Sequence, residues 1–123
     1  MAGYLLVVDD DPDVVHTLTD LLSSAGHEAL GATSFEDGKR LLGGPPPPAV
    51  LITDVRLGMF NGLQLALFRP PSTAVIVISG HRDAMIEDET RRLGGVYLLK
   101  PIPGPLLLET IEGLLAARAP GVA

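Results

Sequence analysis

Short apolar runs alternate with segments of helical spacing along the whole chain, and this alternation limits the folds that the chain can adopt. The runs are nearly continuous, as is typical of strands buried on both faces. They cover residues 4–8, 28–32, 49–53, 74–78 and 96–99, of which 28–32 is the weakest candidate. Apolar residues at helical spacing lie in the segments 14–22, 35–42, 63–68, 84–93 and 106–117. Strands and helices that alternate need right-handed crossovers, so the sequence predicts an α/β fold, an open (βα)5 parallel sheet with helices on both faces.

The size and composition of the chain restrict its domain count and its partners. With 123 residues, 46% of them hydrophobic, it can build one compact core but not two ordinary domains. We expect a single domain over residues 1–123, in which Pro120 and Gly121 mark 119–123 as a tail or the start of a linker. The chain has no cysteine, which excludes disulfides and thiolate chemistry. A net charge of −6 with scattered Lys and Arg argues against direct nucleic-acid binding, and the lack of a long apolar run or a signal peptide predicts a cytoplasmic protein with no membrane partner.

Several element boundaries follow from local chemistry. Asp11 suits the N-cap of a helix that has Pro12 at its first position. Gly26 and Gly94 suit the position just after a helix end, where glycine adopts a left-handed conformation most easily. The four prolines of residues 45–48 predict a stiff polyproline II-like connector, and a docking motif for a proline-reading module is the less favoured alternative.

Polar residues follow four of the predicted strands. Asp9 and Asp10 follow the first strand, Asp54 the third, Ser79 the fourth and Lys100 the fifth. Because all strands of a parallel sheet point the same way, these side chains should meet at its carboxyl edge, where open α/β sheets bind their ligands. Taken singly, each residue also fits an ordinary role as a capping acid, a turn residue or a surface charge.

Three crowded carboxylates need a compensating charge, because like-charge repulsion and desolvation both disfavour their ionisation. A hard divalent cation supplies that charge. Mg²⁺ prefers oxygen ligands and binds through one or two carboxylates together with a phosphate, which matches a cluster without His or Cys. Lys100 and Ser79 could neutralise and hydrogen-bond the phosphoryl oxygens. The predicted ligand is therefore a phosphate with Mg²⁺.

These residues lie in motifs that resemble a receiver domain of the two-component response-regulator family. The segments YLLVVDDDPDV, VLITDVRLGMFNG, VIVISGH and YLLKPI occur in this order over nearly the whole chain. The resemblance implies a flavodoxin-like doubly wound sheet with strand order 2-1-3-4-5. It also implies that Asp54 accepts a phosphoryl group from a phosphohistidine of a sensor histidine kinase or a histidine phosphotransfer protein. Mg²⁺ would be held by Asp10, Asp54 and the backbone carbonyl of Arg56, with Asp9 acting mainly through water.

The resemblance further implies a switch. The Ser79 hydroxyl would move to the phosphoryl group and Tyr97 would turn inward, so that a face made of the fourth helix, the fifth strand and the fifth helix changes its preference for an output domain or a second copy. The alternative is that Tyr97 is a half-buried aromatic residue with its hydroxyl in water. Arg56 and His81, each two residues past a site residue, either tune hydrolysis of the acyl phosphate or are simply exposed. The family resemblance implies a cis Lys100–Pro101 bond, which the base rate of about 5–6% for X–Pro bonds does not support.

Two other functions stay open at the level of sequence. A pseudo-receiver would keep the fold as a protein-binding module without using phosphorylation. A small Mg²⁺-dependent phosphatase would need a second acid near its aspartate nucleophile, but Arg56 stands at the relevant position. We therefore expect a phosphoacceptor signalling domain rather than an enzyme. Three departures from the family pattern affect the loops: Gly58 in place of a proline, a short segment with Pro70 and Pro71 before Ser79, and a region before Lys100 that is one residue short.

Overall fold

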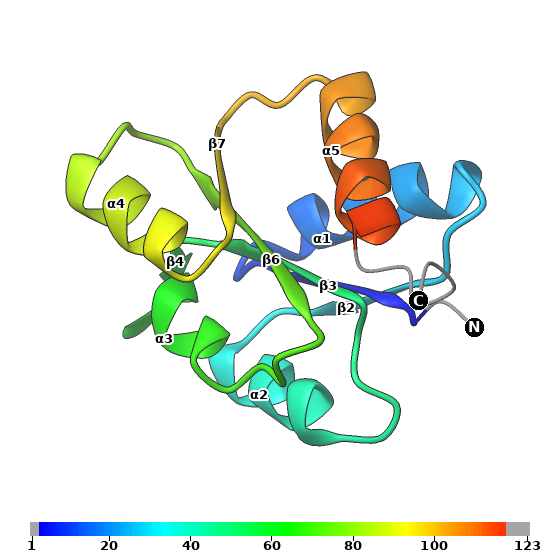
Figure 1. The fold of residues 1–123 in the computed structure, drawn as a ribbon, viewed down its shortest axis with the longest axis horizontal. Helices are drawn as coiled ribbons and strands as arrows, with labels where there is room; N and C mark the ends of the chain where they lie inside the picture. Colours follow the sequence, from blue (N-terminus) through cyan, green and yellow to red (C-terminus); the bar gives the residue numbers. More distant parts are fainter. Residues whose placement is uncertain (1–2, 118–123) are drawn as a thin grey trace.

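A computed structural model of the protein, which describes residues 3–117, contains a central sheet of five parallel strands (Figure 1). The strand order β2-β1-β3-β6-β7 corresponds to the predicted order 2-1-3-4-5, so the predicted fold class is confirmed. The strands are β1 (Leu5–Val8), β2 (Ala29–Ala32), β3 (Val50–Asp54), β6 (Ala74–Ser79) and β7 (Val96–Leu99). The weakest predicted strand, at 28–32, is β2 at one edge of the sheet.

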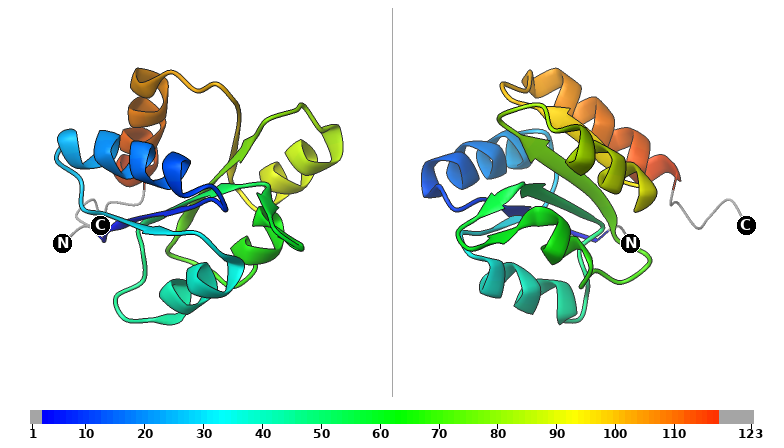
Figure 2. Two further views of the ribbon diagram at one scale, coloured as in Figure 1. Left: turned by 180° about the vertical axis from the view of Figure 1, so that it is seen from behind. Right: turned by 90° about the vertical axis from the view of Figure 1, so that its left-hand side faces the viewer.

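Helices cover both faces of this sheet (Figure 2). One face packs against α1 (Pro12–Ser24) and α5 (Gly104–Ala117). The other face packs against α2 (Phe35–Gly43), α3 (Gly62–Ala66) and α4 (Ala84–Arg92). Neighbouring residues of a strand therefore belong to different cores: Leu51 of β3 packs on the α2 side and Ile52 on the α1 side. The central strands β1, β3 and β6 are buried on both faces and read as continuous apolar runs, whereas the edge strands β2 and β7 are partly exposed.

The predicted helix boundaries agree with the caps of the structure. Asp11 is the N-cap of α1 and accepts a hydrogen bond from the Asp13 N–H at 2.9 Å, with Pro12 at the first helical position. Gly26 and Gly94 follow the ends of α1 and α4 with φ of 92° and 78°, the left-handed conformation predicted for them. The chain thus leaves each helix at a residue that the sequence marks.

The segment after β3 differs from the sequence prediction. A short antiparallel hairpin, β4 (Arg56–Leu57) and β5 (Phe60–Asn61), precedes α3, and Gly58 turns it with a φ of 63°. Helix α3 starts at a capping box formed by Asn61 and Gln64 and ends at Ala66, earlier than predicted. The backbone N–H groups of residues 67–69 bond three residues back, so the last turn tightens ahead of Pro70.

Two prolines follow cis peptide bonds. Lys100–Pro101 is cis, as the family resemblance implies. Pro45–Pro46, in the connector predicted to be polyproline II-like, is also cis, which the sequence did not predict. The predicted tail at 119–123 lies outside the described residues. Within residues 3–117, no helix has the length and apolar character needed to cross a bilayer, and a cytoplasmic location stays a prediction.

Candidate functional site

The carboxyl edge of the sheet brings the predicted site residues together. Asp54 and Ser79 are the last residues of β3 and β6, and Lys100 directly follows β7. Adjacent strands hold these positions in register, because Asp54 pairs with Ile78 and Ser79 pairs with Leu99. The Lys100 N–H also donates to the Ser79 carbonyl at 2.8 Å. Strand pairing therefore fixes the spacing of the site before any side-chain contact is made.

Three carboxylates form a cluster next to this edge. Asp9, Asp10 and Asp54 each offer an oxygen that lies within 4.8 Å of the others. Asp9 and Asp54 are 4% and 9% exposed, whereas Asp10 is open to solvent. Backbone groups orient the two buried acids: the Asp11 N–H donates to Asp9 Oδ1 at 2.9 Å, and the Arg56 N–H donates to Asp54 Oδ2 at 3.1 Å.

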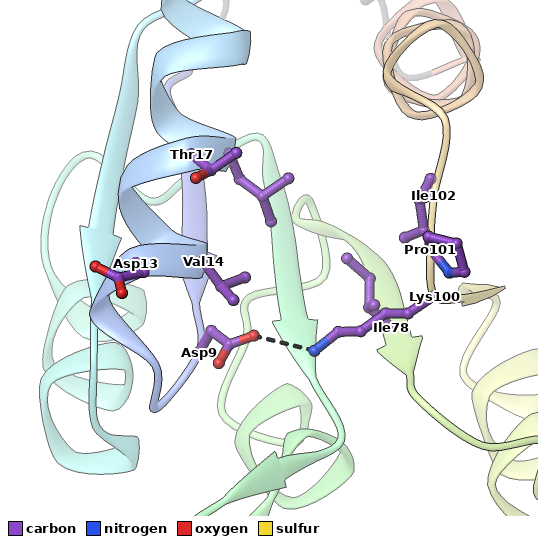
Figure 3. Close-up of a pocket in the computed structure, with 9 residues that line it drawn as sticks. Asp9, Asp13, Val14, Thr17, Ile78, Lys100, Pro101 and Ile102 are labelled. Carbon is purple, nitrogen blue, oxygen red and sulfur yellow. Dashed lines mark ion pairs between the residues drawn. The ribbon is translucent and has the colours of Figure 1, made fainter.

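Lys100 bridges the two buried acids. Its Nζ lies 3.0 Å from Asp54 Oδ1 and 3.5 Å from Asp9 Oδ2, and its side chain reaches across the strand ends (Figure 3). Burial alone would lower the pKa of Lys100, but the hydrogen bond and charge of Asp54, with a contribution from Asp9, raise it overall. Burial raises the pKa of Asp9, and the neighbouring Asp54 and Asp10 add to this, against the lowering by the Asp11 N–H and Lys100. The raised pKa of Asp9 therefore reflects mainly its burial.

The donor set of the cluster fits a hard divalent cation. All three side chains offer oxygen, no histidine or cysteine takes part, and one acid is accessible to solvent. Mg²⁺ and Ca²⁺ prefer such ligands, and Mg²⁺ keeps several waters in its coordination shell. An acidic triad of this kind is typical of the Mg²⁺ site of receiver domains.

The hairpin β4–β5 begins two residues after Asp54, and its first residue, Arg56, lines the cavity at Asp54. The Gly62 N–H donates to the Val55 carbonyl at 2.8 Å, which closes the base of the hairpin. A Cβ atom at Gly62 would collide with the backbone oxygen of Asp54 and with the Thr53 side chain, so this position requires glycine. Phe60 stacks on Phe35 of α2 with ring centroids 4.4 Å apart, which ties the hairpin to the helix layer.

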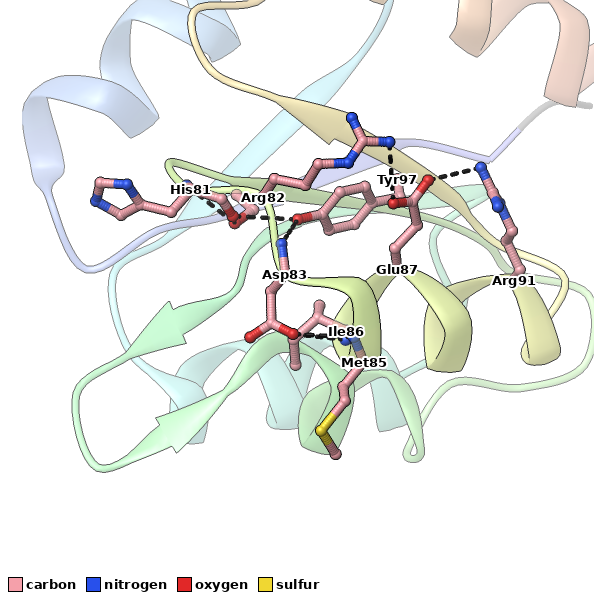
Figure 4. Close-up of polar contacts among 9 residues, drawn as sticks. His81, Arg82, Asp83, Met85, Ile86, Glu87, Arg91 and Tyr97 are labelled. Atoms are coloured by element: carbon pink, nitrogen blue, oxygen red, sulfur yellow. Dashed lines mark hydrogen bonds and ion pairs between the residues drawn. The ribbon is translucent and has the colours of Figure 1, made fainter.

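Ser79 and Tyr97 make their hydrogen bonds to the loop between β6 and α4. Ser79 Oγ donates to the His81 carbonyl at 2.5 Å. The Tyr97 hydroxyl donates to the same carbonyl at 3.2 Å, as Figure 4 shows. The Tyr97 oxygen accepts in turn from the Asp83 N–H at 3.1 Å. His81 thus acts through its backbone, whereas sequence reasoning considered only its side chain. No sequence signal could have revealed this acceptor, because every residue has a carbonyl.

Two cavities flank the site. One, of about 280 Å³, contains Asp54, Ser79 and Lys100 and is rimmed by Arg56, His81 and Arg82. The other, of about 600 Å³, lies beside Asp9 and Lys100, between α1 and the segment after β7 (Figure 3). Its walls include the apolar side chains of Val14, Leu18 and Ile102. Asp54 lines only the smaller of these two cavities, whereas Lys100 lines both.

A model of the response regulator receiver domain matches residues 5–112 of the chain. The chain belongs to this family. As a receiver domain it is a signalling phosphoacceptor rather than a catalytic enzyme, and the predicted family is confirmed.

Three similar proteins illustrate how this receiver domain relates to known ones. The protein PilH of Pseudomonas aeruginosa is 33% identical over 118 residues, which cover 91% of this chain and 97% of PilH. The transcriptional regulatory protein FixJ of Bradyrhizobium diazoefficiens is 29% identical over 124 residues, which cover 96% of this chain but 59% of FixJ. A CheY-like receiver domain protein from Methanospirillum hungatei has the same fold, with a TM-score of 0.86 at 22% identity over 96% of this chain and 97% of that one.

Proposed function

We propose that residues 1–123 act as a single receiver domain that accepts a phosphoryl group on Asp54 in a Mg²⁺-dependent reaction. The donor would be a phosphohistidine of a sensor histidine kinase or a histidine phosphotransfer protein. The observation that carries the proposal is the contact of Lys100 Nζ with Asp54 Oδ1 at 3.0 Å, beside an acidic cluster whose oxygens lie within 4.8 Å of one another. Nucleophile, countercharge and cation ligands then occupy one edge of the sheet.

The chemistry needs few groups. An Asp54 carboxylate oxygen attacks the phosphorus, a new P–O bond forms, and the P–N bond breaks with its electron pair returning to the donor imidazole. Lys100 stays charged beside the developing phosphoryl oxygens, and the Arg56 N–H orients the carboxylate. Asp10, Asp54 and the Arg56 carbonyl would hold Mg²⁺, with Asp9 acting through water. The cation supplies neutralisation of the phosphoryl charge.

Signal output would follow from the hydroxyl of Ser79. This hydroxyl has one proton, and it is bonded to the His81 carbonyl. To bond a phosphoryl oxygen on Asp54, the Ser79 hydroxyl must leave the His81 carbonyl, and Tyr97, which also donates to this carbonyl, would then turn inward. We propose that this exchange changes the loop and the face formed by α4, β7 and α5, through which an output domain or a second copy would bind. Arg56 and His81, on the rim of the cavity, would tune access of the hydrolytic water.

The test is incubation with Mg²⁺ and acetyl phosphate, followed by measurement of the intact mass. The expected result is one added phosphoryl group, absent in Asp54→Asn and absent when EDTA removes the cation. A chain that binds Mg²⁺ but gains no mass would be the pseudo-receiver. Sustained turnover of a phosphate ester such as p-nitrophenyl phosphate would identify the phosphatase instead.

A further inference from the structure

Glu87 joins two arginines on the side of α4 that faces the loop after β6. Its carboxylate contacts the guanidinium of Arg82 at 3.3 Å and that of Arg91 at 2.6 Å (Figure 4). The Glu87 side chain is 13% exposed, whereas both arginine side chains are 68% exposed. A carboxylate that is largely removed from water interacts with its partners more strongly than a fully exposed one, because the local dielectric constant is lower.

Arg82 belongs to the loop whose backbone holds the Ser79 hydroxyl. The loop runs from Gly80 to Asp83 and carries the His81 carbonyl that accepts from Ser79 and Tyr97. Asp83 closes the loop as the N-cap of α4, accepting from the Ile86 N–H at 3.2 Å. Glu87 of α4 forms an ion pair with the Arg82 side chain, and the Tyr97 hydroxyl, from β7, accepts a hydrogen bond from the Asp83 N–H. The loop is thus held by two contacts in the conformation in which the Ser79 hydroxyl donates its proton to the His81 carbonyl.

We infer that Glu87 is a positioning residue: by holding Arg82, it stabilises the loop conformation in which Ser79 is bonded to His81, and so opposes phosphoryl binding at Asp54. This inference rests on the proposed function. The ion pair lies outside the acidic cluster and the Lys100 contact, and Glu87 reaches the site through the loop that carries Arg82. Breaking it should make the phosphorylated arrangement easier to reach.

Arg91 competes with Arg82 for the Glu87 carboxylate. It lies in the last turn of α4 and shares the Glu87 carboxylate with Arg82. Loss of Arg91 leaves Glu87 to Arg82 alone, which should hold the loop at least as firmly as before. The two arginines therefore have different predicted effects, although each carries the same charge and contacts the same acid.

The test is titration of the Mg²⁺-loaded protein with beryllofluoride, an anionic mimic of the phosphoryl group. Arg82→Gln and Glu87→Gln are each expected to tighten binding by about two- to fivefold, the range of a partly exposed ion pair. Together they should tighten it no more than either alone, because they break the same contact. Arg91→Gln should produce no tightening. In the absence of beryllofluoride, amide hydrogen exchange at residues 80–83 should be faster in Arg82→Gln and Glu87→Gln only.

The chain supplies matched controls on the same helix. Arg92 and Glu89 form an exposed pair at 3.5 Å, so Arg92→Gln and Glu89→Gln repeat the charge changes without touching the loop. If Arg82 were a direct anion ligand, Arg82→Gln would weaken binding instead, and this result would overturn the inference. Variants that behave like their controls would overturn it as well. Wild-type protein that binds no beryllofluoride would refute the proposed function, whereas the exchange measurement still tests the loop contact.

Discussion

The carboxyl edge of the sheet has two halves that differ in the interactions their side chains make before a ligand binds. On the acid–lysine side, formed by Asp9, Asp10, Asp54 and Lys100, three carboxylates lie close together and one ammonium group contacts two of them. On the hydroxyl side, formed by Ser79, Tyr97 and the loop 80–83, the hydroxyls already have internal partners. Burial is the main cause of the raised pKa of Asp9, and the neighbouring Asp54 and Asp10 raise it further, against the lowering by the Asp11 N–H and Lys100.

This difference indicates that the acid–lysine side supplies most of the binding free energy for a ligand, and that the hydroxyl side rearranges after the ligand has bound. The acid–lysine side gains interactions when a cation arrives, since its three carboxylates lie beside only one ammonium group, and the cation and Lys100 together can then bind an anionic phosphoryl group. The hydroxyl side must exchange one hydrogen bond for another, so its net gain is the small difference between two bonds. We therefore expect substitutions on the first side to have large effects and those on the second side to have modest ones.

The largest effect is expected for Lys100→Met. This change removes the only side-chain cation that the described residues place within 4.0 Å of Asp54 or Asp9. The rate of phosphorylation by acetyl phosphate should fall about a hundredfold, because one preorganised donor to the transferring group is lost. The rate is measured from the intact mass of samples quenched at successive times. A rate within threefold of the wild type would show that Lys100 does not take part in the phosphorylation reaction.

Asp9→Asn is expected to separate cation binding from stability. Mg²⁺ affinity should fall about tenfold or more, as for loss of a group that orients a metal site through water. The metal-free protein should become more stable at pH 7: the folded-state pKa of Asp9 is raised, so its ionisation destabilises the fold as pH rises through that pKa. Calorimetric titration and thermal unfolding without Mg²⁺ measure the two effects. A melting temperature of metal-free Asp9→Asn below that of the metal-free wild type would contradict the raised pKa of Asp9.

Ser79→Ala is expected to lower the phosphorylation rate by only about three- to tenfold. The hydrogen bond to a charged phosphoryl oxygen is lost, but the wild-type protein must first give up the bond to His81, so part of the loss cancels. Ser79→Thr, which keeps the hydroxyl, is the matched control and should stay near the wild-type rate. A decrease as large as that of Lys100→Met would mean that the two halves do not differ in the proposed way.

The smallest effect is expected for Tyr97→Phe, which keeps the ring and removes its two hydrogen bonds to the loop. Exchange of the Asp83 amide should become about two- to fourfold faster, since the remaining cap of α4 still holds the loop end. The phosphorylation rate should change less than in Ser79→Ala. An unchanged exchange rate would show that the hydroxyl does not hold the loop in solution.

Much of this architecture could be predicted from the sequence, because it follows from local patterns. The continuous apolar runs predicted strands covered on both faces, and Asp11, Pro12 and Gly26 predicted the limits of α1. Convergence of the acids with Lys100 followed from parallel strand direction, and the contacts of Asp54 and Asp9 with Lys100 agree with it. These features depend on chain geometry more than on the details of packing.

The features that could not be predicted depend on tertiary contacts or on backbone atoms. Two-residue strands such as β4 and β5 are too short for a periodic signal, and the stacking of Phe60 on Phe35 joins distant segments. The tightened end of α3 depends on the i−3 hydrogen bonds that replace helical ones there. The sequence also did not predict that Glu87 forms ion pairs with both Arg82 and Arg91. The Arg82–Glu87 pair has a spacing of five residues, which lies outside the usual spacing of ion pairs on a helix.

The position of Tyr97 has a practical consequence for spectroscopy. The chain contains no tryptophan and only two tyrosines. Tyr4 is buried and its hydroxyl donates to the Leu41 carbonyl near the C-terminal end of α2, so its emission should be a constant background. Tyr97 alone touches the loop after Ser79, and its fluorescence should therefore respond when that loop rearranges. The protein carries an intrinsic optical probe at the place where an added label would disturb the motion to be observed.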